Sequence, residues 1–142
     1  MIAIMATIEA STTINAPIDK VWDFVSDIDS EPKYWKGTKQ VRNISKEGNK
    51  ITREVTIAFK DSKCMQTVTF YPKEKILAEF TEGILIGTKT IQLTPHEGGT
   101  KLSATWDIKL SGMMGMFTGM IKKHVKSGTE QALESIKQEI EK

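Results

Sequence analysis

Apolar and polar residues alternate over residues 7–15, and this alternation predicts a strand with one buried face. The strand ends at Pro17, which suits the first turn of a helix because its missing N–H is not needed there. Apolar residues then recur at helical spacing up to Asp29. A short polar and aromatic segment, residues 30–37, follows this predicted helix.

The middle of the chain consists of short alternating runs separated by turn residues such as Gly48, Pro72 and Gly98. The last run is the clearest, because its even-numbered residues from Leu102 to Leu110 are apolar and its odd-numbered residues are polar. Short links between consecutive strands indicate antiparallel pairing. The six predicted strands are residues 38–46, 50–59, 63–70, 75–81, 84–94 and 100–110.

A long helix is predicted from Ser111 or Met113 to about Glu141. Its apolar residues form one stripe along the helix, as expected for an element that packs on a sheet. In the first half only, further apolar or aromatic residues widen the stripe, which indicates that this half also covers a cavity. The stripe contains Met114, Ile121, Val125, Ala132, Leu133, Ile136 and Ile140, and the wider part adds Met113, Phe117, Met120 and His124.

The composition indicates a single globular domain over residues 1–142, with 39% hydrophobic and 27% charged residues. Cys64 is the one cysteine, so the chain has neither an internal disulfide nor a cysteine-based zinc site, and as a small strand residue it is not expected to be a nucleophile. The formal net charge is +2, with both signs spread along the chain. The missing basic stripe argues against a dedicated nucleic-acid-binding protein.

The first six residues are apolar but lack the basic start of a signal peptide and are too few to form one. The uncharged stretch 110–121 has 12 residues and three glycines, against the roughly 18–20 apolar residues that a membrane span needs. We therefore expect a cytoplasmic protein without stable membrane insertion, present as a monomer or a weak homodimer.

Residues 14–27, INAPIDKVWDFVSD, together with Trp35 and the hairpin at 98–102, resemble the START-like (Bet v 1-like, SRPBCC) superfamily. This superfamily includes polyketide cyclase/dehydrase and lipid-transport proteins. The resemblance implies an α+β helix-grip fold, in which a curved seven-stranded antiparallel sheet wraps around a long C-terminal helix and two short helices follow the first strand. It also implies a hydrophobic pocket between the sheet and that helix.

Two cations share the face of the large apolar residues on their strands. Arg53 is in register with Val55 and Ile57, and Lys89 with Ile91 and Leu93, so both are predicted to point inward. Hairpin counting places Arg53 opposite Phe70 and Lys89 opposite Trp106, each against an aromatic ring.

The functional interpretation is a charged handle for a ligand oxygen inside an apolar pocket. The structural alternatives are that the two side chains extend out to solvent at strand ends, or that a bulge reverses their direction.

Other candidate residues lie along the predicted rim and roof of the pocket. His124 flanks the methionine-rich arc of the helix and suits acid–base chemistry, but a structural histidine is the simpler alternative. Tyr34 and Trp35 suit either the pocket mouth or plain packing. Methionines 113 and 120 and the nearby glycines indicate a soft portal or, alternatively, a tapered core.

With His96 in a turn and no pair of histidines at metal-binding spacing, we expect no metal, and no motif predicts a cofactor.

Three functions remain open at the level of sequence. The first is binding, carrying or sensing a small hydrophobic molecule such as a lipid, a quinone or a polyketide-like compound. The second is a cyclase or dehydratase that uses Arg53, Lys89 or His124. The third is a protein-interaction module like the Hsp90-activating members of the superfamily, which an exposed apolar patch would favour. No catalytic constellation is evident, so the first function is the one we expect.

Overall fold

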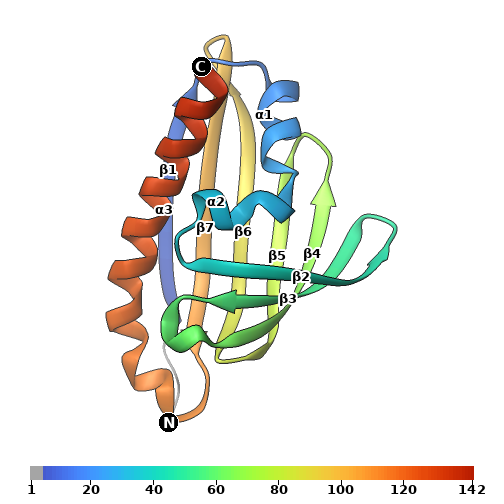
Figure 1. Ribbon diagram of the computed structural model, residues 1–142. Coiled ribbons are helices and arrows are strands. Elements are labelled where there is room, and N and C mark those ends of the chain that lie inside the picture. Colours follow the sequence, from blue (N-terminus) through green and yellow to red (C-terminus); the bar gives the residue numbers. More distant parts are fainter. Residues whose placement is uncertain (1–4) are drawn as a thin grey trace.

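The computed structural model describes residues 5–142, and its seven strands form one antiparallel sheet in the order β1-β7-β6-β5-β4-β3-β2 (Figure 1). Most of the N-terminal stretch on which the signal-peptide argument rests falls on residues 1–4, outside the described residues. The strands are β1 (Ala6–Ile14), β2 (Thr38–Glu47), β3 (Lys50–Ile57), β4 (Lys63–Tyr71), β5 (Lys75–Gly83), β6 (Leu85–His96) and β7 (Gly99–Leu110).

The helix predicted after the first strand is divided into three short pieces. Helix α1 (Ile18–Val25) ends where Asp27 leaves the helical conformation, with φ −79° and ψ 75°. A 3₁₀ turn, η1 (Ile28–Ser30), and a one-turn helix, α2 (Glu31–Tyr34), follow it. The polar and aromatic segment 30–37 therefore contains α2, and two short α-helices follow β1 as the family resemblance implies.

The long C-terminal helix also begins differently from the prediction. Residues 112–117 form a 3₁₀ helix, η3 (Gly112–Phe117), and the α-helix α3 runs over Thr118–Glu141. The predicted stripe is confirmed, because its residues are buried or half-buried along the full length of α3. Figure 1 shows α3 lying along β1, with α1 and α2 on the same side of the sheet.

Together these elements confirm the predicted helix-grip architecture. Among residues 5–142 no helix is both long and apolar enough to cross a membrane.

The register places the two cations on the concave face. Lys89 pairs with Trp106, as hairpin counting predicts. The predicted pairing of Arg53 with Phe70 is wrong, because Arg53 pairs with Gln66. The reason is a 3₁₀ turn, η2 (Phe59–Asp61), which takes Phe59 out of the strand and shifts the pairing by four residues. An even shift preserves the face, so Arg53 still points inward and is only 1% exposed.

Candidate ligand-binding site

Three charged side chains meet inside the fold, one from α2, one from β3 and one from β6. Arg53 Nη2 lies 2.5 Å from Glu31 Oε1, and Lys89 Nζ lies 3.4 Å from Glu31 Oε2. One carboxylate therefore faces two cations, one through each oxygen. The exposed fractions of the side chains are 1% for Arg53, 6% for Lys89 and 14% for Glu31. This cluster (Glu31, Arg53 and Lys89) carries a formal charge of +1 in a largely dry environment.

Arg53 is fully engaged by protein partners. Its Nε donates to Gln66 Oε1 at 2.7 Å and its Nη1 donates to the carbonyl oxygen of Ile28 at 3.2 Å, in addition to the pair with Glu31. The guanidinium thus connects β3, β4, η1 and α2. Because each nitrogen of the guanidinium already has a protein partner, Arg53 positions Glu31 and contributes charge.

Lys89 is only partly engaged. Its ammonium carries three donors, and its one hydrogen bond to a described residue is the long one to Glu31. The ammonium also lies over the rings of Trp35 and Trp106, at 3.4 Å and 5.1 Å from their centroids. The aromatic faces stabilise the charge, and Glu31 is the one described residue that accepts a hydrogen bond from the ammonium. Lys89 is therefore the group in the cluster that can serve a ligand.

Burial and charge act against each other on these pKa values. Burial alone raises the pKa of Glu31, but the charges and hydrogen bonds of Lys89 and Arg53 outweigh burial, so that the pKa falls below its ordinary value of 4.5. The pKa of Lys89 is lowered, mainly because burial disfavours its charged form. The carboxylate of Glu31 opposes this shift, and the positive charge of Arg53 adds to it. An added anion beside Lys89 would balance the charge of the cluster.

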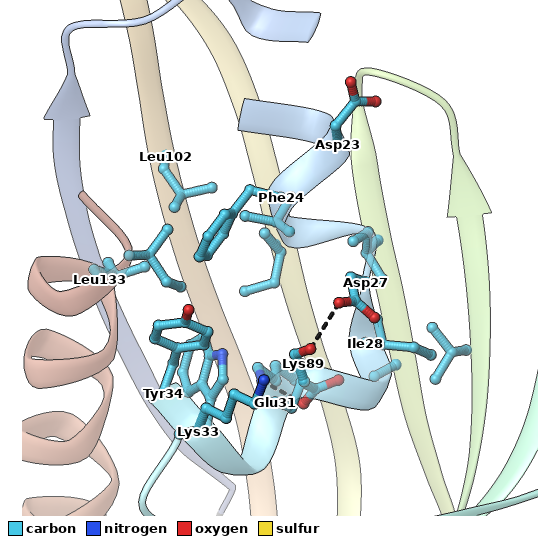
Figure 2. A pocket seen from close by; sticks show the side chains of 18 residues that line it. Asp23, Phe24, Asp27, Ile28, Glu31, Lys33, Tyr34, Lys89, Leu102 and Leu133 are labelled. Carbon is cyan, nitrogen blue, oxygen red and sulfur yellow. Dashed lines mark hydrogen bonds and ion pairs between the residues drawn. The ribbon is translucent and has the colours of Figure 1, made fainter. Parts of the chain in front are cut away.

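Lys89 and Glu31 line a cavity of about 280 Å³ between the sheet, α3 and the α1–α2 segment. Figure 2 shows Lys89 reaching Glu31 at one end, while Phe24, Leu102 and Leu133 stand around the apolar part and Tyr34 extends its hydroxyl toward them. The acidic Asp23 and Asp27 lie on its α1 side. The lining is mostly apolar and includes two lysines, the buried Lys89 and the exposed Lys33. Lys89 is therefore the cationic group in the interior of the cavity, and one such group among apolar side chains is common in small-molecule sites.

A second cavity, of about 350 Å³, lies under the first half of α3. Its lining is the more apolar of the two, and it includes Trp106, Met120 and His124. Trp35 lines both cavities. Trp106 is held by a hydrogen bond from its Nε1 to Thr129 Oγ1 at 3.0 Å. The two cavities therefore meet at Trp35, whose ring forms an aromatic wall with Trp106 and Phe80 on the side of the second cavity.

The predicted methionine-rich roof is only partly correct. Met113 is 91% exposed and Phe117 40% exposed, and neither lines the cavities described here. The reason is η3, whose three residues per turn break the extrapolation of a 3.6-residue stripe. Met120 is 54% exposed but reaches the second cavity at its edge. With Met116 these residues form an apolar surface, the feature that a protein-interaction function would require.

The other predicted residues fall at three places. Tyr34 and Trp35 line the first cavity, His124 lines the second, and Phe70 lines a third. Phe70 packs edge-on against Trp22, with ring centroids 6.5 Å apart, and lines a shallow third cavity. His124 is therefore not brought together with Lys89.

Sequence reasoning misses Glu31, which lies in a segment without strand or helix periodicity. The signal that could find it is indirect: two buried cations require a buried anion, and Glu31 is an acidic residue close to the aromatic pair 34–35. Gln66 is also missed, although it alternates with the buried Cys64 and Val68. Among residues 5–142 no group of three histidine, cysteine or acidic residues is placed to hold a metal ion.

The fold and the cavity define the class: a helix-grip protein with an interior site between its sheet and its C-terminal helix. The family model described as polyketide cyclase / dehydrase and lipid transport matches residues 5–141, and the chain belongs to this family. No curated protein matches the sequence.

Solved structures with the same fold have low sequence identity to this chain. TTHA0849 from Thermus thermophilus is 16% identical, with a TM-score of 0.81 over 95% of this chain and 97% of that one. Zhui aromatase/cyclase from Streptomyces sp. R1128 is also 16% identical, with a TM-score of 0.82 over 96% and 94%. A START superfamily protein from Mycobacterium smegmatis is 16% identical, with a TM-score of 0.65 over 92% and 98%. These similarities establish the fold.

Proposed function

We propose that the protein binds a small hydrophobic molecule that carries an anionic or hydrogen-bond-accepting oxygen, such as a lipid, a quinone or a polyketide-like compound. The observation that carries this proposal is Lys89, an ammonium group buried at the wall of an apolar cavity with donors left over. A carboxylate, phenolate or carbonyl oxygen beside Lys89 would gain a charge-assisted hydrogen bond, while its apolar part would fill the cavity.

Native mass spectrometry of the purified protein, followed by organic extraction, identifies any hydrophobic molecule that the protein carries. Binding is then measured for wild type, Lys89→Met and Lys101→Met. Lys101 is the matched control, because it is an exposed lysine on the neighbouring strand β7. A hydrogen bond to a charged group contributes about 1.5–3 kcal/mol, so Lys89→Met should weaken binding by roughly 10- to 150-fold. Equal affinities for the three proteins would contradict the role of Lys89.

A second candidate function is a cyclase-type reaction, and the lowered pKa of Lys89 favours it. A lysine with this property, next to a carboxylate at the wall of a cavity, is suited to moving protons on a polycarbonyl substrate. Recovery of a bound compound separates the two functions. A binder returns its ligand unchanged, whereas an enzyme releases a cyclised or dehydrated product, and Lys89→Met abolishes its formation.

A further inference from the structure

The two cavities follow one another along α3. Leu133 and Ile136 line the first cavity, whereas Ile121 and Val125 line the second. With a helical rise of about 1.5 Å per residue, Val125 and Leu133 are about 12 Å apart along the helix axis. Trp35 is the one residue that lines both. The cavities are therefore neighbours, separated at Trp35.

The wall between them has two fixed members and one that is less firmly held. Trp106 lies in β7 and is hydrogen-bonded to Thr129, and Phe80 lies in β5 and stacks on Trp106 with ring centroids 6.2 Å apart. Trp35 lies in the link between α2 and β2. It is 7% exposed, yet its indole nitrogen has no hydrogen-bond partner among the described residues. Packing and the ammonium of Lys89 hold its ring.

The indole N–H of Trp35, unpaired among the described residues, is a second free donor on a side chain whose ring lies 3.4 Å from Lys89 Nζ, measured to the ring centroid. Every buried side-chain nitrogen or oxygen that is fully enclosed in residues 5–142 has a partner. The Trp35 nitrogen is therefore not fully enclosed by protein.

We infer that the two cavities are compartments of one site for an elongated amphiphile, and that Trp35 sets the length of apolar tail that the protein accepts. This inference rests on the proposed function, because Lys89 holds the polar end of the ligand beside the wall. A short tail fits in the first compartment. A longer tail enters the second, more apolar compartment only when the Trp35 ring moves aside, which gives up its contacts with Lys89 and Trp106.

The test uses straight-chain carboxylates of increasing length, from octanoate to hexadecanoate, with wild type, Trp35→Ala and Trp35→Phe. Each buried methylene should raise affinity about fourfold, and in wild type this gain should stop at the length that fills the first compartment. In Trp35→Ala the gain should continue over several more carbons. Trp35→Phe, which retains a smaller ring, should give an intermediate limit and also serves if the alanine variant does not fold.

Trp22→Ala is the matched control, because Trp22 lines neither compartment but the shallow third cavity. Its length limit should equal that of wild type. A common length limit for wild type and the Trp35 variants would overturn the inference while leaving the proposed function intact. If no carboxylate bound to wild type or to any variant, the inference would also be overturned, whereas the proposed function would fail only if the extraction experiment and the Lys89→Met comparison failed as well. A crystal structure with hexadecanoate confined to the first compartment of Trp35→Ala would also overturn it.

Discussion

Replacing Glu31 by glutamine tests whether this carboxylate is needed to hold two cations inside the fold. The substitution keeps the shape of the side chain and an acceptor for Arg53, but it removes the negative charge that both Arg53 and Lys89 face. Removing one partner of a buried ion pair destabilises a protein by about 3–5 kcal/mol, because the remaining charge is uncompensated. Glutamine still accepts a hydrogen bond, so we expect the lower end of that range, about 3 kcal/mol.

This loss is a large part of the roughly 5–15 kcal/mol that stabilises a typical domain. For a chain of this length it corresponds to a fall in melting temperature of roughly 10 °C. Urea unfolding followed by tryptophan fluorescence measures the free energy of unfolding. The control is Glu79→Gln, an exposed glutamate on β5 whose replacement should change stability by no more than about 0.5 kcal/mol.

The pH dependence gives an independent check. Because the pKa of Glu31 is lowered in the folded protein, its stabilisation is present above the ordinary value of 4.5 and is lost as the pH falls through the folded-state value. The stability difference between wild type and Glu31→Gln should therefore be largest near neutral pH and shrink in acid. In Glu31→Gln the pKa of Lys89 loses the opposing effect of the carboxylate, so the stability of this variant should rise as the pH increases toward 10.5.

A double substitution separates the charge effect from simple packing. Lys89→Met removes one of the two uncompensated cations, so Glu31→Gln with Lys89→Met should be more stable than Glu31→Gln alone. If Glu31→Gln lost less than about 1 kcal/mol at neutral pH, as expected for an exposed pair, and its stability did not depend on pH, the cluster would not be the dry, coupled site described here.

Four further results follow from single features of the structure. Thr129→Val should lower stability by about 1–3 kcal/mol in urea unfolding, because it leaves the buried Trp106 N–H without its acceptor, and Thr129→Ser should restore most of this loss. Gly87→Ala should prevent folding or reduce soluble yield sharply, because φ is +129° and an added Cβ would lie 2.0 Å from the carbonyl oxygen of Asp107. Gly119→Ala should instead raise the free energy of unfolding by about 1 kcal/mol, and the melting temperature with it, because Gly119 lies in α3 with open space around it. The thiol of Cys64 should react with a thiol reagent only after unfolding, because burial raises its pKa and shields it; rapid labelling of the native protein would contradict the buried position.

Local pattern was sufficient to predict most of the fold. Strand alternation has a period of two residues, so it indicates both the strands and the faces that their side chains occupy, and it directs Arg53 and Lys89 inward even where the pairing is miscounted. The helical stripe likewise predicts the packed face of α3. The resemblance at residues 14–27 supplied the closure of these elements into one helix-grip fold, which periodicity alone does not encode.

What the tertiary structure decided is how these inward residues meet. Glu31 lies in a one-turn helix with no periodic pattern. It faces Arg53 and Lys89 only because α2 packs over the sheet, which brings Glu31 close to two residues that are distant from it in sequence. The exposure of Met113 follows from a 3₁₀ geometry that the sequence does not signal. The division of the interior at Trp35 likewise depends on sheet curvature and on the path of one short link, which long-range packing determines. The sequence by itself determined which side chains of the strands and of α3 face the interior, and long-range packing decided which of them form a site.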